Sequence, residues 1–457
     1  MKRYSFTALI LSLFTGLVFT ACNSEDDENL VLSRDCIVRN IVLGTLQQPR
    51  TVKDSKGNDS TYIIDIAGVN YPMSIDQING RIYNPDSLPK GTDLTKVIFS
   101  TLQVTGYATV KSLVTGEDTV MTDKDTLDFS MPRKITVHAS NRDFSREYTL
   151  EVRVHKESPD SIKWHNLTPS ASSALTGFAD CRIMADGKNL YVFGQTNDGS
   201  SKVIATQTGA PSFETASDLK TTGNKALDIR SIRRLGQNFY ALSEGKLFMT
   251  ADVTQAWTPA ASQIAHFNAL AVCSNDSIYA LEGGKMYSSA DGCHWTESMA
   301  DTADKWPTSN LTSTFISTTE KPNESLMLLS GNRDTEIVLW QQYIKKDSFF
   351  SYPWMFMPQT EELGRFPFPS LDLPCMVTYD EKPLLLGLTT DKHTVISYQS
   401  SDNGRTWKPF TLKFPLNKEM KHITFAVDDE NFIWSISCST GQVFKGRHNR
   451  MGWLIKE

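Results

Sequence analysis

The sequence has no excess of positive charge and no long hydrophobic run. Its 457 residues include 46 Lys and Arg and 52 Asp and Glu, which gives a formal net charge of −6. A chain of this charge lacks the basic surface with which proteins bind phosphate backbones, so we expect no role with nucleic acid. The longest apolar stretch, residues 8–21, is shorter than the roughly 20 residues that cross a bilayer. We therefore expect no lasting transmembrane helix.

The residue patterns of common catalytic and metal sites are also missing. The eight histidines show neither HxxxH nor HExxH spacing, and the chain has no G-x-S-x-G motif. After Cys22 no two cysteines are closer than 20 residues, which excludes the usual zinc spacings. We expect no metal or other cofactor, although the sequence leaves a calcium requirement open. Cys181, Cys273 and Cys438 lie in apolar strand patterns and are predicted to be mainly small buried hydrophobes.

The first residues have the features of an export signal. Lys2 and Arg3 precede the apolar stretch, and Cys22 directly follows Ala21. This order resembles a bacterial lipoprotein signal, in which Cys22 becomes the lipid-modified first residue. The acidic residues after it resemble the export tag of surface-exposed Bacteroidetes lipoproteins. The resemblance implies a signal peptide over 1–21, a tether over 22–29, and an outer-membrane protein that faces the cell exterior and touches the membrane only through its lipid. An ordinary cleaved signal with an incidental cysteine is the alternative.

Residues 30–156 show the alternation of half-buried strands. Short runs of Val, Ile, Thr and Tyr are separated by turn residues and lie at 61–66, 96–100, 107–110, 134–139 and 148–154. Several such strands predict a β-sandwich. The last two runs resemble the terminal hairpin of Ig-like modules, so we expect an Ig-like sandwich. A linker is expected over 157–163.

Residues 164–457 repeat. Phe239–Leu242 matches Ile278–Leu281 at a period of about 39, and the two-strand pattern that follows each segment also matches. Four more copies centre on Leu190–Phe193, Leu326–Leu329, Leu384–Gly387 and Phe432–Ser435. Repeats of short strands without helical periodicity predict a β-propeller. We expect an all-β chain with six blades. Trp164 belongs either to a strand that closes the ring or to a seventh blade.

One turn of the repeat resembles the Asp-box of sialidase-like propellers. Residues 400–407 match S-x-D-x-G-x-T-W, and residues 289–295 form a version one residue shorter. In such a turn the aspartate caps backbone N–H groups, the glycine adopts a positive φ, and the tryptophan fills the gap between blades. We therefore expect Asp402 to be a turn residue rather than a catalytic acid.

The resemblance to sialidases implies an arginine triad that grips a substrate carboxylate. Arg182 lies on the expected innermost strand of the first blade, but the matching strands at 314–318 and 375–378 carry no arginine. A sialidase is therefore not expected, and Arg182 is interpreted as an inner-channel or rim residue. The whole arrangement resembles an uncharacterised family of Bacteroidetes surface lipoproteins with a sialidase-like or galactose-oxidase-like propeller.

Besides Arg182 on its strand, the candidate binding residues lie in turns, in one irregular connection, and in a smaller loop before the fourth blade that contains Trp306. The expected turns between second and third strands face away from the Asp-box side, and a connection rich in Pro and aromatics precedes the fifth blade. The aromatics there either form an exposed platform for a ligand or belong to the propeller core, and the turn aspartates are otherwise ordinary solvated turn residues. The candidates are Arg182, Asp198, Asp334, Asp391, Trp306, Trp354, Phe356, Phe366 and Phe368.

These observations favour a non-catalytic cell-surface binding protein. Glycan capture is the leading hypothesis and adhesion to a surface protein comes next. The alternatives are an exported glycoside-active enzyme that uses rim carboxylates such as Asp198, Asp334 or Asp391, and a protein–protein assembly module.

Overall fold

The structure is a computed structural model that describes residues 33–53, 57–168, 173–302, 304–334, 336–346, 348–349, 351–358, 368–389, 394–417 and 419–452. The described chain divides into two compact units at Ser158 and Pro159, within the expected linker. The predicted signal peptide, Cys22 and the acidic tether lie outside the described residues. Among the described residues, no helix combines the length and the apolar character that crossing a bilayer demands.

The N-terminal unit is a β-sandwich. Its hydrophobic core includes Phe99 of the three-stranded sheet and Val137 and Tyr148 of the six-stranded sheet. The three-stranded sheet contains β1 (Val38–Leu43), β6 (Val97–Val104) and β9 (Thr126–Leu127). The six-stranded sheet has the order β4 (Ser74–Asp76), β5 (Arg81–Tyr83), β11 (Ser145–Glu151), β10 (Arg133–His138), β7 (Tyr107–Lys111), β8 (Asp118–Met121), and β2 (Thr45–Lys53) pairs with β3 (Asp59–Ala67).

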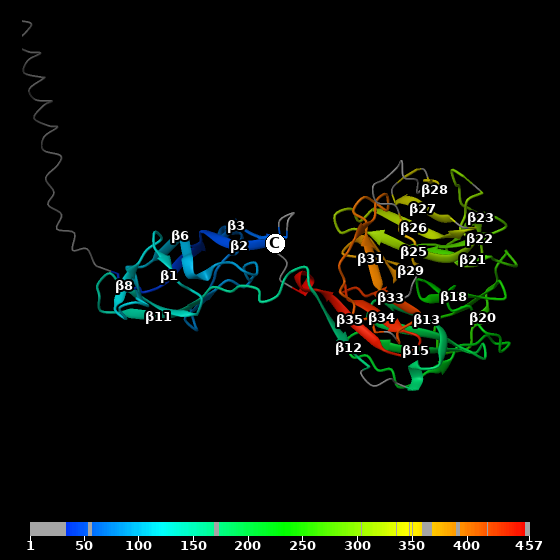
Figure 1. Ribbon diagram of the computed structural model, residues 1–457, viewed down its shortest axis with the longest axis horizontal. Coiled ribbons are helices and arrows are strands. Elements are labelled where there is room, and N and C mark those ends of the chain that lie inside the picture. Colours follow the sequence, from blue (N-terminus) through cyan, green and yellow to red (C-terminus); the bar gives the residue numbers. More distant parts are fainter. Residues whose placement is uncertain are drawn as a thin grey trace, which may run out of the picture. The chain divides into compact units, whose positions relative to one another are not determined.

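The second unit is a propeller of six four-stranded antiparallel sheets (Figure 1). The first three blades are β13 (Phe178–Asp186), β14 (Asn189–Thr196), β15 (Ser201–Gln207), β16 (Ser217–Asp218); β17 (Arg233–Leu235), β18 (Asn238–Ser243), β19 (Lys246–Thr250), β20 (Thr258–Pro259); and β21 (Ala269–Cys273), β22 (Ile278–Glu282), β23 (Lys285–Ser289), β24 (Thr296–Glu297). The next two are β25 (Ser309–Ser317), β26 (Glu324–Arg333), β27 (Glu336–Lys345), β28 (Met355–Met357); and β29 (Asp372–Tyr379), β30 (Lys382–Leu388), β31 (Val395–Gln399), β32 (Lys408–Pro409).

The sixth blade closes the ring. It contains β33 (Ile423–Val427), β34 (Ile433–Ser437) and β35 (Val443–His448), and its fourth strand is β12 (Ile162–Asn166) from the start of the unit. Figure 1 shows β12 beside β35, where Trp164 is paired with Gly446. The expected six blades are therefore confirmed, and Trp164 belongs to the closing strand. The six repeat segments found in the sequence are the second strands of these blades.

A disulfide bond reinforces the closure. Cys181 on β13 of the first blade is bonded to Cys438, which follows β34 of the sixth blade. The expected burial is confirmed, since Cys181 and Cys438 are 4% and 1% exposed, but the two cysteines also form a bond across the junction between two blades, which the sequence did not predict. Cys273, the third cysteine of that group, is a free thiol.

Trp434 of β34 packs against the first blade at the junction where the ring closes, and a tryptophan near the outermost strand fills the gap at each of the other five junctions. Each of these five residues comes just before, or lies on, the outermost strand of its blade and packs against the preceding blade; they are Trp257, Trp295, Trp354, Trp407 and Trp164. A large aromatic suits this position because radially arranged sheets diverge towards their outer edges. Blade packing therefore accounts for the aromatic that the repeat carries.

The turn that resembles an Asp-box is held by its aspartate. Asp402 accepts hydrogen bonds from Thr406 N (2.8 Å) and Ser400 Oγ (2.8 Å), and the indole of Trp407 donates to Gly404 O (3.0 Å). Partial burial disfavours ionisation of Asp402, but the hydrogen bonds from Thr406 and Ser400 outweigh it and lower the pKa. The side chain is fully engaged within the turn, as expected for a structural residue.

Candidate binding site in the propeller channel

The innermost strands of the propeller surround a central cavity of about 560 Å³. Residues of β13, β17, β21, β25, β29 and β33, one strand from each blade, line it, together with the residues next to those strands. All of these lining residues are among the described ones. The channel is therefore built by the whole ring and not by a single blade.

The blades are tied to one another along this channel. Ser313 Oγ of the fourth blade donates to Ala271 O of the third (2.7 Å), and Thr378 Oγ1 of the fifth donates to Phe315 O of the fourth (2.8 Å). Cys375 donates its Sγ–H to Phe425 O of the sixth blade (3.1 Å). These bonds satisfy polar groups at the inner edges of the sheets and give the channel a fixed wall.

Four arginines from the first two blades converge on the channel. Two of them form ion pairs: Arg230 donates to both carboxylate oxygens of Asp180 (2.6 and 2.8 Å), and Arg234 pairs with Asp186. The other two, Arg182 and Arg233, have no carboxylate within ion-pair distance among the described residues. The channel therefore contains two guanidinium groups that form no ion pair with the described carboxylates.

Arg233 acts as a clamp between blades. It is 9% exposed. Its Nε and Nη2 donate to Ala271 O of the third blade (3.3 and 3.0 Å), and its Nη1 donates to Arg230 O and Ile232 O (both 2.9 Å). All three of its nitrogens are therefore engaged with backbone carbonyls.

Arg182 uses only one of its nitrogens in this way. Its Nη1 donates to Arg230 O and Ile232 O (both 2.7 Å), the same two carbonyls that Arg233 uses. Its Nε and Nη2 have no acceptor among the described residues, all lining residues of the cavity included. Desolvation by burial and, after it, repulsion from Arg233 lower the pKa of Arg182 to about 9. The nearby carboxylate of Asp228 acts in the opposite direction but does not outweigh these two causes.

The channel offers no residue prepared for nucleophilic attack. Burial raises the pKa of the Cys273 thiol to about 12 and also raises the pKa of the Cys375 thiol, so both stay protonated at neutral pH, whereas a nucleophilic cysteine needs its thiolate. Asp180 and Asp186 are held by arginines and not arranged as the free acid and base that glycoside hydrolysis requires.

One rim of the channel shows backbone strain. Asn310, Leu373 and His422 have φ values of 50°, 47° and 50°, and each lies at the start of an innermost strand or directly before it. A non-glycine residue in this region costs about 1–3 kcal/mol and is commonly held at functional sites. The strands β25 and β29 also carry register shifts at this end, as bulges near binding sites do.

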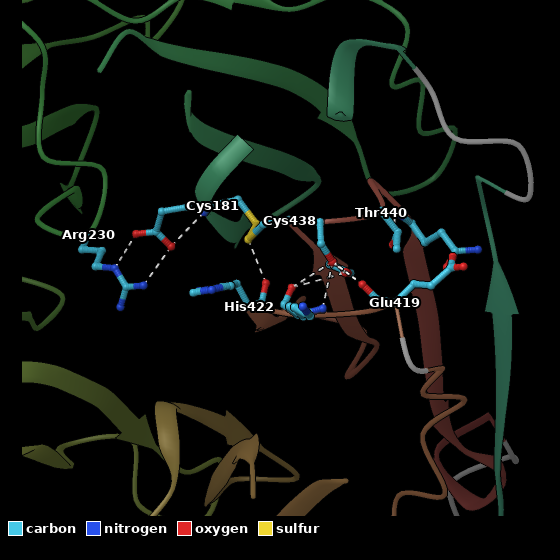
Figure 2. The surroundings of a disulfide bond; sticks show 11 residues. Cys181, Arg230, Glu419, His422, Cys438 and Thr440 are labelled. Atoms are coloured by element: carbon cyan, nitrogen blue, oxygen red, sulfur yellow. Dashed lines mark hydrogen bonds and ion pairs between the residues drawn. A yellow bond between two sulfur atoms is a disulfide. The ribbon is translucent and has the colours of Figure 1, made fainter. Parts of the chain in front are cut away.

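This rim lies on the face opposite the turns that resemble Asp-boxes. Neighbouring strands of a blade are antiparallel, so the start of the first strand shares a face with the turn between the second and third strands. Arg230, Asp180 and the exposed His422 lie here. Figure 2 shows Arg230 on one side of the disulfide and Glu419 and Thr440 on the other, with His422 close to the bond. The carbonyl oxygen of His422 lies 2.8 Å from Cys438 Sγ.

The structure buries most of the expected aromatic platform. Trp306, Trp354 and Phe368 are 3%, 0% and 6% exposed, and Phe356 is half-buried on β28. Trp306 stacks on Trp340 with ring centroids 3.9 Å apart. The interpretation as an exposed platform is therefore wrong for the three buried rings, because they fill the gaps on either side of the fourth blade. Phe366 lies outside the described residues.

The turn aspartates remain on the surface. Asp198 is exposed in the turn between β14 and β15, where hydrogen bonds from Thr196 and Ser200 lower its pKa to about 2. Asp334 is exposed in the turn between β26 and β27. Neither lines the channel, so the structure does not bring them together with Arg182. Asp391 lies outside the described residues.

Sequence reasoning found one of the four channel arginines and missed three. Arg182 lines the channel as expected, but Arg230, Arg233 and Arg234 were not singled out. Three arginines within residues 230–234, just before the second strand of a blade, are the signal that points to them. They come from one neighbouring blade, whereas the search for a triad compared equivalent strands of distant blades.

Comparison with known proteins assigns both units to one family. The family model described as DUF6242 beta propeller domain matches residues 158–456, and the model described as the DUF6242 N-terminal domain, a domain of unknown function, matches residues 41–152. The chain belongs to the DUF6242 family. No curated protein matches its sequence.

Solved structures similar to the DUF6242 propeller have low identity. They include a Trichoderma reesei protein of Carbohydrate-Active Enzymes Family AA12 (10% identity, TM-score 0.40, covering 64% of this chain and 96% of that one). Others are the alpha-L-arabinofuranosidase PaAbf62A from Podospora anserina in complex with cellotriose (11%, 0.34, 64% and 99%) and the SapL1 lectin in complex with alpha methyl fucoside (10%, 0.37, 58% and 90%). At these values the similarities add no argument about activity.

The described residues contain no group of three or more His, Cys, Asp or Glu side chains arranged to hold a metal ion.

Proposed function

We propose that this protein is a non-catalytic, lipid-anchored binding protein of the cell surface that captures glycans at the channel rim opposite the Asp-box-like turns. The observation that carries the proposal is the channel of about 560 Å³, which offers hydrogen-bond donors from arginines and hydroxyls inside a rigid ring. Ligand sites of proteins are typically concave, preformed and furnished with a few fixed polar groups.

Binding is favoured over hydrolysis by the state of the carboxylates. A glycosidase needs one carboxyl group as acid and a second as base or nucleophile. In the channel, Asp180 and Asp186 are each neutralised by an arginine, and the exposed Asp198 has its pKa lowered by its turn to about 2, which makes it a poor general acid.

An exported location agrees with the disulfide between Cys181 and Cys438, because such bonds form and persist mainly in oxidising compartments. In the proposed protein, Cys22 carries the lipid, residues 22–29 form the tether, and the N-terminal sandwich is an Ig-like spacer. The membrane is contacted only through the lipid.

The proposal is tested with a glycan array probed by the chain from Ser24 to Glu457, which contains both units. We expect binding that falls at least about tenfold when His422 on the rim is replaced by Gly, a residue that accepts its positive φ. The matched control is His294→Ala, which removes an exposed histidine from the opposite face, and its binding should equal that of the wild type.

The competing functions give different results in parallel assays. Release of reducing sugar from a polysaccharide panel would show an enzyme and overturn the proposal. Failure to bind any glycan, together with recovery of a surface protein in a pull-down, would favour assembly instead.

A further inference from the structure

We infer that Arg182 forms an oxyanion subsite in the channel, and that the captured glycan carries a carboxylate or a sulfate ester. This inference rests on the proposed function and names the class of sugar that the same site takes. Uronic acids and sulfated sugars present the same recognisable chemistry, which is a negatively charged group with several acceptor oxygens.

The first argument is the free edge of the guanidinium. Nη1 of Arg182 is anchored by Arg230 O and Ile232 O at 2.7 Å, while Nε and Nη2 lack an acceptor among the described residues. These two nitrogens are on one edge of a planar group, and that edge matches the spacing of two oxygens of a carboxylate or sulfate. The anchoring of Nη1 fixes the orientation of the edge before any ligand arrives.

The second argument is the pairing of two like charges. Arg182 and Arg233 donate through Nη1 to the same two carbonyl oxygens, so their guanidinium groups lie next to each other. Like charges held together repel, and the repulsion is stronger where water is excluded. An anion on the open edge of Arg182 would relieve it. Arg233 is then a positioning residue, because its nitrogens are already occupied by carbonyls.

The third argument is the charge distribution around the pair. The remaining charged groups that line the channel are the ion pairs Arg230–Asp180 and Arg234–Asp186, together with Asp429, which follows the far end of β33. His422 is the remaining titratable group at the rim, apart from the buried thiols. The pairs cancel, so the described residues that line the rim half of the channel carry an excess of positive charge. The carboxylate of Asp228 acts on Arg182 and Arg233 from outside this lining, without an ion pair to either.

The inference is tested by isothermal titration calorimetry on the chain from Ser24 to Glu457. The probes are tetragalacturonate for the carboxylate, a sulfated chondroitin disaccharide for the sulfate ester, and cellotetraose as the neutral sugar. We expect at least one acidic probe to bind at least about tenfold more tightly than cellotetraose. Its affinity should fall as sodium chloride is raised, because the contact is ionic.

Two variants of Arg182 and one control assign the site. Arg182→Met removes the charge, and Arg182→Lys keeps the charge but loses the two-nitrogen edge. Both variants should bind the acidic probe about tenfold or more weakly than the wild type does. Arg405→Met removes an equal charge from an exposed arginine in the turn on the opposite face, so its affinity should stay within about twofold of the wild type. Arg182→Lys decides the question if Arg182→Met does not fold.

The outcomes separate the two proposals. The oxyanion subsite is overturned if acidic and neutral sugars bind with equal affinity. It is also overturned if folded Arg182→Lys binds the acidic probe as tightly as the wild type does. Glycan capture survives both results. Equal losses in Arg182→Met and Arg405→Met would show a general effect of net charge and also overturn the oxyanion subsite. If no sugar of any kind binds, the proposed function itself fails. The relative affinities of tetragalacturonate and the disaccharide then show which oxyanion the edge prefers.

Discussion

Single side chains in this propeller differ in how much of their role the local sequence defines. Asp402 acts within a turn of eight residues, and its motif predicted its role correctly. His448 depends on distant partners: its Nδ1 lies 3.1 Å from Tyr379 Oη, and its backbone N donates to the same oxygen (2.9 Å). Tyr379 is on the fifth blade, 69 residues away, and no local pattern predicts that contact.

His448 should make the stability of the propeller depend on pH. It is 2% exposed, and burial, followed by repulsion from Arg450, lowers its pKa to about 4. Folding therefore favours the neutral imidazole. As the pH falls from about 6.5 towards 4, His448 becomes protonated in the unfolded chain but stays neutral in the folded chain. The contribution of His448 to the free energy of unfolding is therefore fully present above pH 6.5 and is lost on acidification. The loss should reach about 3 kcal/mol.

Urea unfolding at pH 7.5 and pH 4.5, followed by tryptophan fluorescence, checks this. Eight of the nine tryptophans lie between Trp164 and Trp434, within the propeller, so the signal reports mainly on the propeller. His448→Gln, which cannot titrate, should lose most of the difference that His448 contributes. His294→Gln on the surface should retain it, and equal pH dependence in wild type and His448→Gln would contradict the assignment.

At the scale of the element, the blade is the unit that the sequence predicts best and the channel the unit that it predicts least. The second strand of each blade is buried on both faces, so its apolar run is easily recognised, as in Leu384–Gly387. The innermost strands mix apolar and polar residues because one edge faces the channel, and β17 has only three residues, Arg233–Leu235. Arg230, Arg233 and Arg234 were therefore missed.

The direction of a side chain between blades also escapes sequence reasoning. Trp354 belongs to a run of aromatics that fits either a platform or a core. Its burial is decided by the neighbouring third blade, where Tyr279 meets its ring edge-on with centroids 5.7 Å apart. The equivalent positions of Trp295 and Trp407 suggest its role only once the blades have been aligned.

Trp354→Ala should therefore destabilise the propeller. Removing a fully buried indole leaves a cavity between two blades, which we expect to lower the free energy of unfolding by about 3–5 kcal/mol. Tyr352→Ala is the control, because Tyr352 is 40% exposed two residues away and should cost much less. Trp354→Phe should also be milder, since the indole N–H of Trp354 has no acceptor among the described residues.

Urea unfolding of the three variants at neutral pH measures these costs. Glycan affinity of the folded Trp354→Ala protein should equal that of the wild type. If Trp354→Ala loses glycan binding but not stability, Trp354 would be a binding residue and not a packing residue.

At the scale of the whole propeller, closure of the ring combines strand pairing with a covalent bond. β12 completes the sixth blade through its pairing with β35, and the disulfide joins residues 257 positions apart. In the loop-entropy model, a cross-link that closes so long a loop strongly reduces the conformational entropy of the unfolded chain. The sequence could not reveal this pairing, because it depends on the first and last blades meeting in space.

Replacing Cys181 and Cys438 together by Ser should lower the free energy of unfolding by roughly 2–5 kcal/mol. Dithiothreitol should lower the melting temperature of the wild type but not that of the double variant. Cys293→Ser, which changes a free cysteine, should keep the sensitivity of the wild type. A wild-type melting temperature indifferent to the reductant would contradict a stabilising role for the bond.

The shared sixth blade has a mechanical consequence. A pull on the chain ahead of Ile162, from a tether while the propeller grips its ligand, loads β12 at its end, where Ile162 is paired with His448. The strand would peel away one residue pair at a time at low force. Unravelling would then halt at Cys181, because the disulfide passes the load directly to the last blade. Under load the ring would thus extend only at its first strand, while the disulfide keeps the blades after Cys181 closed. Binding of the ligand would therefore survive the extension.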